Sequence, residues 1–132
     1  MDIANKKILI VDDQMFVRTA LKKELEEDPR FKVECAGSGE EAIKLVTGNY
    51  PFDLIFIDLV MPKMDGIQTC KKLKEISPQS EYVCFTGIFD RVLTARGADY
   101  IEVDGRTRLL YKPFRAHAFI ETAQQIFEQI EK

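Results

Sequence analysis

Short apolar runs alternate with stretches of helical periodicity along the chain, and this order constrains the fold more than any other feature. The apolar runs lie at Ile8–Val11, Leu54–Ile57 and Tyr82–Phe85, and a further strand, with Val33 and Cys35 on one face, is expected at Phe31–Ala36. A short run that is apolar at successive positions is typical of a parallel strand covered by helices on both faces. Strands that alternate with helices through right-handed crossovers predict an open, doubly wound α/β sheet.

The segments between these runs have apolar residues at the spacing of amphipathic helices. Ser38 and Glu41 form a capping-box pattern at the start of one such segment. The expected inward-facing residues are Val17, Ala20, Leu21 and Leu25 in the first helix, Ala42, Ile43 and Val46 in the second, Ile67, Cys70, Leu73 and Ile76 in the third, and Phe119, Ile120, Ala123, Ile126, Phe127 and Ile130 in the last.

The region between Thr86 and Lys112 departs from this alternation. Its helical pattern is weak, whereas residues 100–103 and 106–111 are rich in β-branched, aromatic and aliphatic side chains. Asp104 and Gly105 between them suit a two-residue type I′ turn. We therefore expect a short or irregular fourth helix, and an added hairpin at 100–111 whose second arm becomes the fifth strand of the sheet.

Composition excludes several classes of protein. Nineteen basic and 22 acidic residues give a net charge of −3, which argues against direct binding of nucleic acid or an anionic membrane. The apolar runs are too short to span a bilayer, and the first residues do not form a signal peptide. Three cysteines without CxxC spacing fit reduced thiols in a cytoplasmic protein. We expect one domain over residues 1–132.

The predicted strands end in polar residues that suit phosphoryl chemistry. Asp12 and Asp13 end the first strand, Asp58 the third, Thr86 the fourth and Lys112 the last. Ligands of open α/β sheets bind outside the carboxyl ends of the strands, so these groups are expected to converge. Clustered carboxylates beside a buried strand need neutralisation, and hard oxygen ligands at a partly open site favour Mg²⁺. This chemistry predicts phosphoryl transfer with a carboxylate as nucleophile.

These residues resemble a known family along essentially the whole chain. Asp12 and Asp13, the segment 58–66, Thr86, and Lys112 with Pro113 match the receiver domain of two-component response regulators, including its chemotaxis-regulator-like members. The resemblance implies a flavodoxin-like, five-stranded parallel sheet of order 2-1-3-4-5 with helices on both faces. It also implies a phosphoacceptor signalling domain rather than a turnover enzyme.

The resemblance assigns a role to each site residue. Asp58 is the phosphoacceptor, which receives the phosphoryl group from a sensor histidine kinase or a phosphotransfer protein. Lys112 and Thr86 contact the phosphoryl oxygens. The metal ligands of Mg²⁺ are Asp12 (through water), Asp13, Asp58 and the backbone carbonyl of Val60.

The output is expected to be contact with a downstream target protein, and a homodimer is left open. One residue departs from the family: Leu109 stands where receivers carry a switch aromatic.

Parts of the sequence also fit three other functions. Gly37, Gly39 and Ala42 match a dinucleotide-binding fingerprint, but they follow the second strand, and the first turn holds carboxylates that repel a pyrophosphate. A dehalogenase-type phosphatase requires Asp-x-Asp after the first strand, but Gln14 and Met15 follow Asp13, so Met15 stands where the second aspartate would be. The alternative that stays open is a receiver-like interaction module that does not use phosphorylation.

Overall fold

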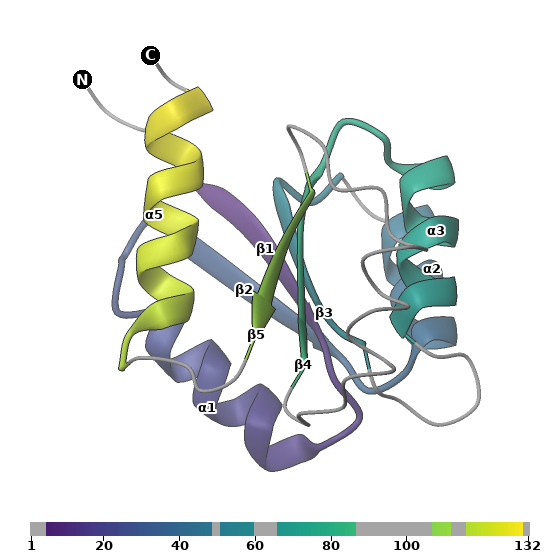
Figure 1. Cartoon of the computed structure of the whole chain (residues 1–132), viewed down its shortest axis with the longest axis horizontal. Helices are drawn as coiled ribbons and strands as arrows, with labels where there is room; N and C mark the ends of the chain where they lie inside the picture. Colours follow the sequence, from purple (N-terminus) through teal and green to yellow (C-terminus); the bar gives the residue numbers. More distant parts are fainter. Residues whose placement is uncertain (1–4, 49–50, 60–65, 87–106, 112–115, 131–132) are drawn as a thin grey trace.

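The computed structural model describes residues 5–48, 51–59, 66–86, 107–111 and 116–130. Five strands form one parallel sheet of order β2-β1-β3-β4-β5, as expected (Figure 1). The strands are β1 (Lys6–Val11), β2 (Phe31–Ala36), β3 (Leu54–Asp58), β4 (Glu81–Thr86) and β5 (Thr107–Tyr111). The described helices are α1 (Met15–Leu25), α2 (Gly39–Gly48), α3 (Gly66–Ile76) and α5 (Ala118–Ile130).

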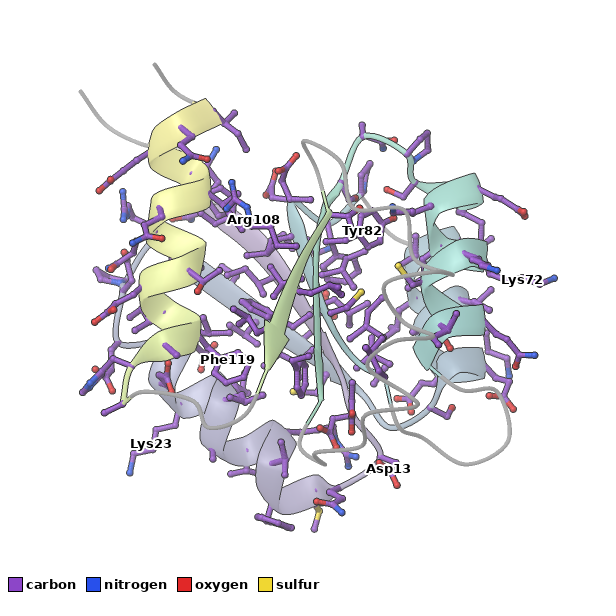
Figure 2. All side chains as sticks on the ribbon, in the orientation of Figure 1. Asp13, Lys23, Lys72, Tyr82, Arg108 and Phe119 are labelled. Atoms are coloured by element: carbon purple, nitrogen blue, oxygen red, sulfur yellow. The ribbon has the colours of Figure 1, made fainter. Side chains whose placement is uncertain are left out.

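Helices cover both faces of the sheet, which explains why its central strands are apolar at successive positions. Helices α1 and α5 lie on one face, and α2 and α3 on the other (Figure 1). Every residue of β3 is buried, because its side chains point alternately into two separate cores. Phe119 belongs to the core under α1 and α5, whereas Tyr82 belongs to the core under α2 and α3 (Figure 2).

Most expected core positions are buried, but Ala20 of α1 and two helix ends are exposed. Ile76 and Ile130 are exposed by 42% and 55%. Each is the last residue of its helix, where packing against the sheet stops, so the periodic pattern extends further than the buried stripe.

The added hairpin is only partly open to comparison. Residues 107–111 form β5, the fifth strand, which pairs in parallel with β4, as expected of the second arm. The first arm, the turn at Asp104 and Gly105, and the irregular fourth helix lie outside the described residues.

Two helices receive their N-terminal caps in different ways. At α2, Glu41 N donates to Ser38 Oγ at 3.1 Å, as the capping-box pattern predicts, while the Glu41 carboxylate accepts from Gly37 N at 2.9 Å. At α5 the cap comes from α1. The Glu24 carboxylate accepts hydrogen bonds from the backbone N–H groups of Phe119 and Ile120, at 3.0 and 2.9 Å. Glu24 thus joins the two helices of this layer.

Asp28 makes a second link to α5, and its charge stabilises the fold. Its buried carboxylate accepts from the backbone N–H and the Nε of Arg30, at 3.0 and 2.9 Å, and from Gln124 of α5 at 3.3 Å. The Arg30 guanidinium and these donors hold the pKa of Asp28 well below its usual range. The stabilisation is therefore full above the pKa of the unfolded carboxyl, about 4, and is lost as the pH falls toward the lower folded pKa.

We expect Asp28→Asn to lower the free energy of unfolding by about 1–3 kcal/mol at pH 7, because the charge-assisted hydrogen bonds of Arg30 are lost. Denaturant unfolding of parent and variant from pH 7 down to pH 3 measures this, and the difference should shrink below about pH 4. Glu26→Gln is the control, since the Glu26 carboxylate forms a solvent-exposed pair with Lys22. A difference that does not depend on pH would contradict the assignment to charge.

Candidate phosphoacceptor and metal site

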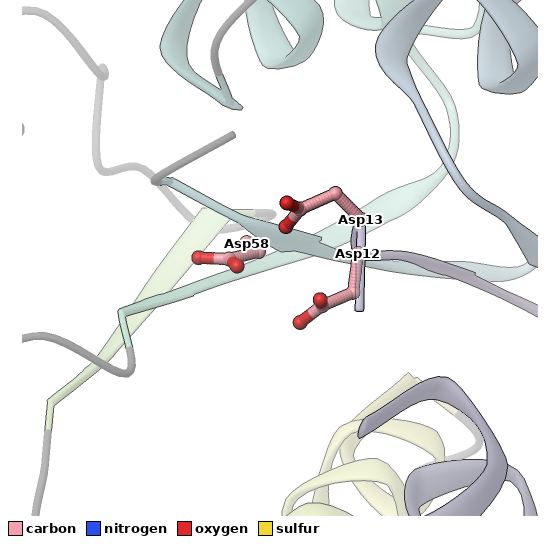
Figure 3. Close-up of side chains that lie close together, drawn as sticks. All are labelled: Asp12, Asp13 and Asp58. Carbon is pink, nitrogen blue, oxygen red and sulfur yellow. The ribbon is translucent and has the colours of Figure 1, made fainter. Parts of the chain in front are cut away.

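Three carboxylates meet at the carboxyl ends of the two central strands. Asp12 and Asp13 follow β1 directly, and Asp58 is the last residue of β3. One oxygen from each of the three side chains lies within 4.8 Å of the other two, and Figure 3 shows the groups gathered at this edge of the sheet. The cluster is only partly open to solvent, because Asp13 is exposed whereas Asp12 and Asp58 are 2% and 9% exposed.

The backbone around Asp12 is held from three directions. Its N–H donates to Ala36 of β2 at 3.1 Å, its carbonyl accepts from Arg18 Nη1 at 2.8 Å, and its carboxylate accepts from Gln14 N at 2.8 Å. Burial raises the pKa of the Asp12 carboxyl, and the neighbouring charge of Asp13 raises it further. The hydrogen bonds from Gln14 and with Asp58, and the charge of Arg18, oppose this rise.

Asp58 is fixed by its strand and by the start of α3. Its Cα pairs with Phe85 of β4, and the next residue, Leu59, donates its N–H to the Phe85 carbonyl at 2.8 Å. On the other side, Gly66 packs so closely that a Cβ there would lie 2.5 Å from Leu59 Cα and closer still to the Asp58 carbonyl oxygen. The phosphoacceptor candidate therefore sits on backbone that has little freedom to shift.

The other expected site residues are described less fully. Thr86 ends β4 and pairs with Tyr111 of β5, so both strands end at the same edge as Asp58. Lys112 directly follows Tyr111, but it lies outside the described residues, as does Val60. The structure thus brings Asp12, Asp13 and Asp58 together and places the ends of β4 and β5 beside them.

The donor set fits a hard divalent cation. Carboxylate oxygens from Asp12, Asp13 and Asp58 are ligands that Mg²⁺ prefers, and the exposed side of the cluster leaves room for water and phosphate oxygens. Three carboxylates in so small a space repel one another, and a bound cation lowers that cost. The arrangement suits nucleophilic attack by a carboxylate on a phosphorus atom.

The rim of the site carries exposed apolar side chains that the sequence analysis did not single out. Met15 and Phe16, in the first turn of α1, are 70% and 73% exposed. They lie two and three residues after Asp13 in the chain, whereas the buried residues of α1 lie further along, at Leu21 and Leu25. Apolar periodicity does not distinguish these two residues from other apolar residues of a helix. Their exposure can be seen only in the folded chain.

Arg18 was also missed. Arg18 lies six residues after Asp12, and this spacing does not by itself predict a contact. The two residues meet because the chain turns from β1 into α1.

No described helix is long and apolar enough to cross a membrane. In the part of the chain that the structure describes, the acidic cluster at β1 and β3 is the one group of three or more histidine, cysteine or carboxylate side chains arranged to hold a metal ion.

Comparison with known proteins identifies a family for this chain. Residues 8–124 match the family described as response regulator receiver domain. A probable chemotaxis protein CheY of Rhizobium etli is 32% identical over 130 residues, which cover 96% of this chain and 97% of that protein. The alkaline phosphatase synthesis transcriptional regulatory protein PhoP of Bacillus subtilis is 40% identical over 99 residues, 72% of this chain. The matched part spans only 40% of PhoP.

Solved structures show the same architecture. A two-component response regulator from Clostridium difficile superimposes with a TM-score of 0.81 at 25% identity, covering 97% of this chain and all of that one. The chemotaxis protein CheY4 of Vibrio cholerae gives 0.75 at 27% identity, covering 93% and 99% of the two chains. With the family match over residues 8–124 and the acidic cluster at the switch point of the sheet, the chain belongs to the receiver domain family of response regulators.

Proposed function

We propose that this chain acts as one receiver domain, which accepts a phosphoryl group on Asp58 and thereby changes the surface that it offers to a downstream target protein. The observation that supports this most is the convergence of Asp12, Asp13 and Asp58 at the carboxyl edge of the sheet in a member of the receiver family. The donor in this proposal is a phosphorylated histidine on a sensor kinase or on a phosphotransfer protein.

The transfer step balances as a simple displacement. A carboxylate oxygen of Asp58 forms a bond to phosphorus while the bond from the donor imidazole nitrogen to phosphorus breaks, and the imidazole, which carries a proton on its other nitrogen, leaves as the neutral base. The protein contributes position and electrostatics, since Asp58 is held on rigid backbone at a partly dry edge.

Asp12, Asp13 and Asp58 would hold Mg²⁺, together with the carbonyl of Val60 that the family resemblance adds. When bound, the cation supplies neutralisation of the charge on the carboxylates and the phosphoryl oxygens. Lys112 and Thr86 are proposed to contact those oxygens, and this part of the proposal rests on the resemblance and on where β4 and β5 end.

We expect the purified chain to take up one phosphoryl group from acetyl phosphate when Mg²⁺ is present and none when the cation is chelated. Without it the phosphoryl oxygens meet an uncompensated cluster of carboxylates. Intact-mass measurement detects the label, and titration of Mg²⁺ followed by NMR detects binding near Asp13.

The competing function, an interaction module that does not use phosphorylation, predicts a different outcome. It is favoured if millimolar Mg²⁺ does not bind and acetyl phosphate leaves no label.

Docking of the donor is proposed to involve Met15 and Phe16. A donor protein that brings its histidine to Asp58 must cover the surface around it, and these two side chains offer exposed apolar surface at the start of α1, two and three residues after Asp13. Apolar anchors of this kind carry a large share of the binding energy in protein interfaces.

We expect Phe16→Ala to slow phosphoryl transfer from the donor protein about tenfold or more through weaker binding, as for an interface anchor, while labelling by acetyl phosphate stays unchanged. Rates measured at several donor concentrations separate binding from transfer. Lys23→Ala is the control, because Lys23 is an exposed residue of the same helix further from the site (Figure 2). If the labelling rate of Phe16→Ala fell equally with acetyl phosphate and with the donor protein, the substitution would have disturbed the site itself. If the rate with the donor protein did not fall, the donor would dock elsewhere.

A further inference from the structure

Two buried cysteines face each other between α3 and β4. The Cys70 and Cys84 side chains are 1% and 0% exposed, and the Cys84 thiol donates to the Cys70 sulfur with the Sγ atoms 3.7 Å apart. Both belong to the core under α2 and α3. Cys35 lies on β2 and packs against the core on the opposite face of the sheet, so it is not positioned to compete for either partner.

We propose that Cys70 and Cys84 are a redox-sensitive pair, which forms an intramolecular disulfide between α3 and β4 when the protein is exposed to a peroxide. One thiol, as its thiolate, attacks a peroxide oxygen and becomes a sulfenic acid, and the peroxide's other oxygen leaves as water after protonation. The second thiol then displaces the sulfenic hydroxyl, which leaves as a second water. Two thiols are oxidised and one peroxide is reduced.

The geometry brings the pair most of the way to a bond. The sulfurs must approach from 3.7 Å to about 2.05 Å, which requires rotation of the side chains and a movement of the helix toward the strand. Cys70 is on a helix and Cys84 on a strand, so the bond would join two separate elements of the fold. Only 14 positions of sequence separate them, so the crosslink closes a short loop.

Burial sets the conditions under which the pair reacts. The hydrogen bond with Cys70, and then burial, raise the pKa of the Cys84 thiol, so the reactive thiolate is rare while α3 is packed against the sheet. Oxidation therefore depends on brief separation of α3 from β4, which admits both water and peroxide. A pair of this kind stays reduced in the closed protein and responds to sustained oxidant.

A crosslink here would act close to the phosphoacceptor. Helix α3 begins at Gly66, directly against the backbone of Asp58, and β4 pairs with β3 beside it. Joining α3 to β4 would restrict the movement of that helix relative to the strand end. The crosslink itself is independent of the proposed phosphoryl transfer, so it can be tested whether or not Asp58 is phosphorylated.

The test treats the purified, reduced chain with hydrogen peroxide and counts thiols after denaturation. We expect the number of free thiols to fall from three to one. After digestion with trypsin, fragments 64–71 and 75–91 should be joined, and fragment 33–44, which contains Cys35, should not be crosslinked. Cys35→Ser should form the same crosslink, and Cys70→Ala should form none. A native protein that keeps its thiols under conditions that oxidise the denatured chain, or that joins fragment 33–44 to another, would overturn the proposal.

A second measurement does not depend on any variant folding. Equilibration with glutathione redox buffers gives the effective concentration of the two thiols for each other, in the native protein and in denaturant. We expect this value to be about tenfold or more higher in the native protein, because the fold already holds the sulfurs in contact. An equal or lower native value would show that the fold opposes the bond, and would overturn the proposal.

Discussion

Replacing Asp58 by asparagine is expected to abolish phosphoryl labelling by acetyl phosphate or by a donor protein while the fold persists. The amide has nearly the shape of the carboxylate, but it lacks the anionic oxygen that attacks phosphorus. Intact-mass measurement after incubation with acetyl phosphate and Mg²⁺ decides the matter, and labelling of the variant at the parent level would show that Asp58 is not the acceptor.

Asp53→Asn provides the matched control. Asp53 is exposed and lies just before β3, at the opposite end of the strand from Asp58, and its carboxylate accepts from Lys7 N at 2.8 Å. The same change of charge is made there, and the amide oxygen can still accept that hydrogen bond. Labelling of Asp53→Asn should match the parent.

The Asp58→Asn change should also stabilise the chain when no divalent cation is present. One oxygen of each of the three carboxylates lies within 4.8 Å of the other two, so removal of one charge relieves repulsion worth on the order of 1 kcal/mol. Addition of Mg²⁺ should then stabilise the parent more than the variant, because a cation that binds the folded state adds to its stability. Denaturant unfolding with and without Mg²⁺ measures both effects, and equal gains in the two proteins would argue against a shared cation site.

The sheet and most of the acidic site could be predicted from local sequence because both depend on regular geometry. Apolar runs identify buried parallel strands, and residues that follow such strands meet at one edge whatever the loops do. Asp12, Asp13 and Asp58 illustrate this, since their convergence needs only the strand order.

Contacts that depend on how elements dock could not be predicted in the same way. Glu24 caps α5 from 95 residues away, and no pattern around Glu24 marks a cap for another helix. The contact of Cys70 with Cys84 depends on the rotation of α3 over the sheet, which periodicity does not determine to within one side chain. The exposure of Ile76 has a similar origin, because the periodic pattern carries no information on where the neighbouring core stops.

Gly66 shows how such a docking contact constrains the site. The sequence alone does not show why a glycine is needed at this position, because a glycine at the start of a helix is usually interpreted as part of a turn. In the structure its φ is not positive, so conformational freedom is not the reason for glycine here. The reason is space: a Cβ would lie 2.5 Å from Leu59 Cα and 2.7 Å from the Asp58 carbonyl carbon. Real Cβ atoms essentially never lie so close to backbone, and backbone cannot rotate away as a side chain can.

We therefore expect Gly66→Ala to lower the free energy of unfolding by about 2–3 kcal/mol, at the upper end of the range for overpacking, because either α3 or the end of β3 must move. The same displacement should shift Asp58 relative to Asp12 and reduce both Mg²⁺ affinity and the rate of labelling by acetyl phosphate. Denaturant unfolding and Mg²⁺ titration of the same preparation measure the two effects together.

Gly48→Ala is the matched control, since Gly48 ends α2 and a Cβ there would meet no atom within 4 Å. We expect that substitution to be neutral, or to stabilise the chain by up to about 1 kcal/mol through the lower entropy of the unfolded state. If Gly66→Ala were as well tolerated as Gly48→Ala, the start of α3 would have to lie further from Asp58 than the structure places it. If Gly66→Ala lowered stability but left Mg²⁺ affinity unchanged, the packing of α3 would not affect the geometry of the carboxylates. The inference that this helix holds Asp58 in position would then be wrong.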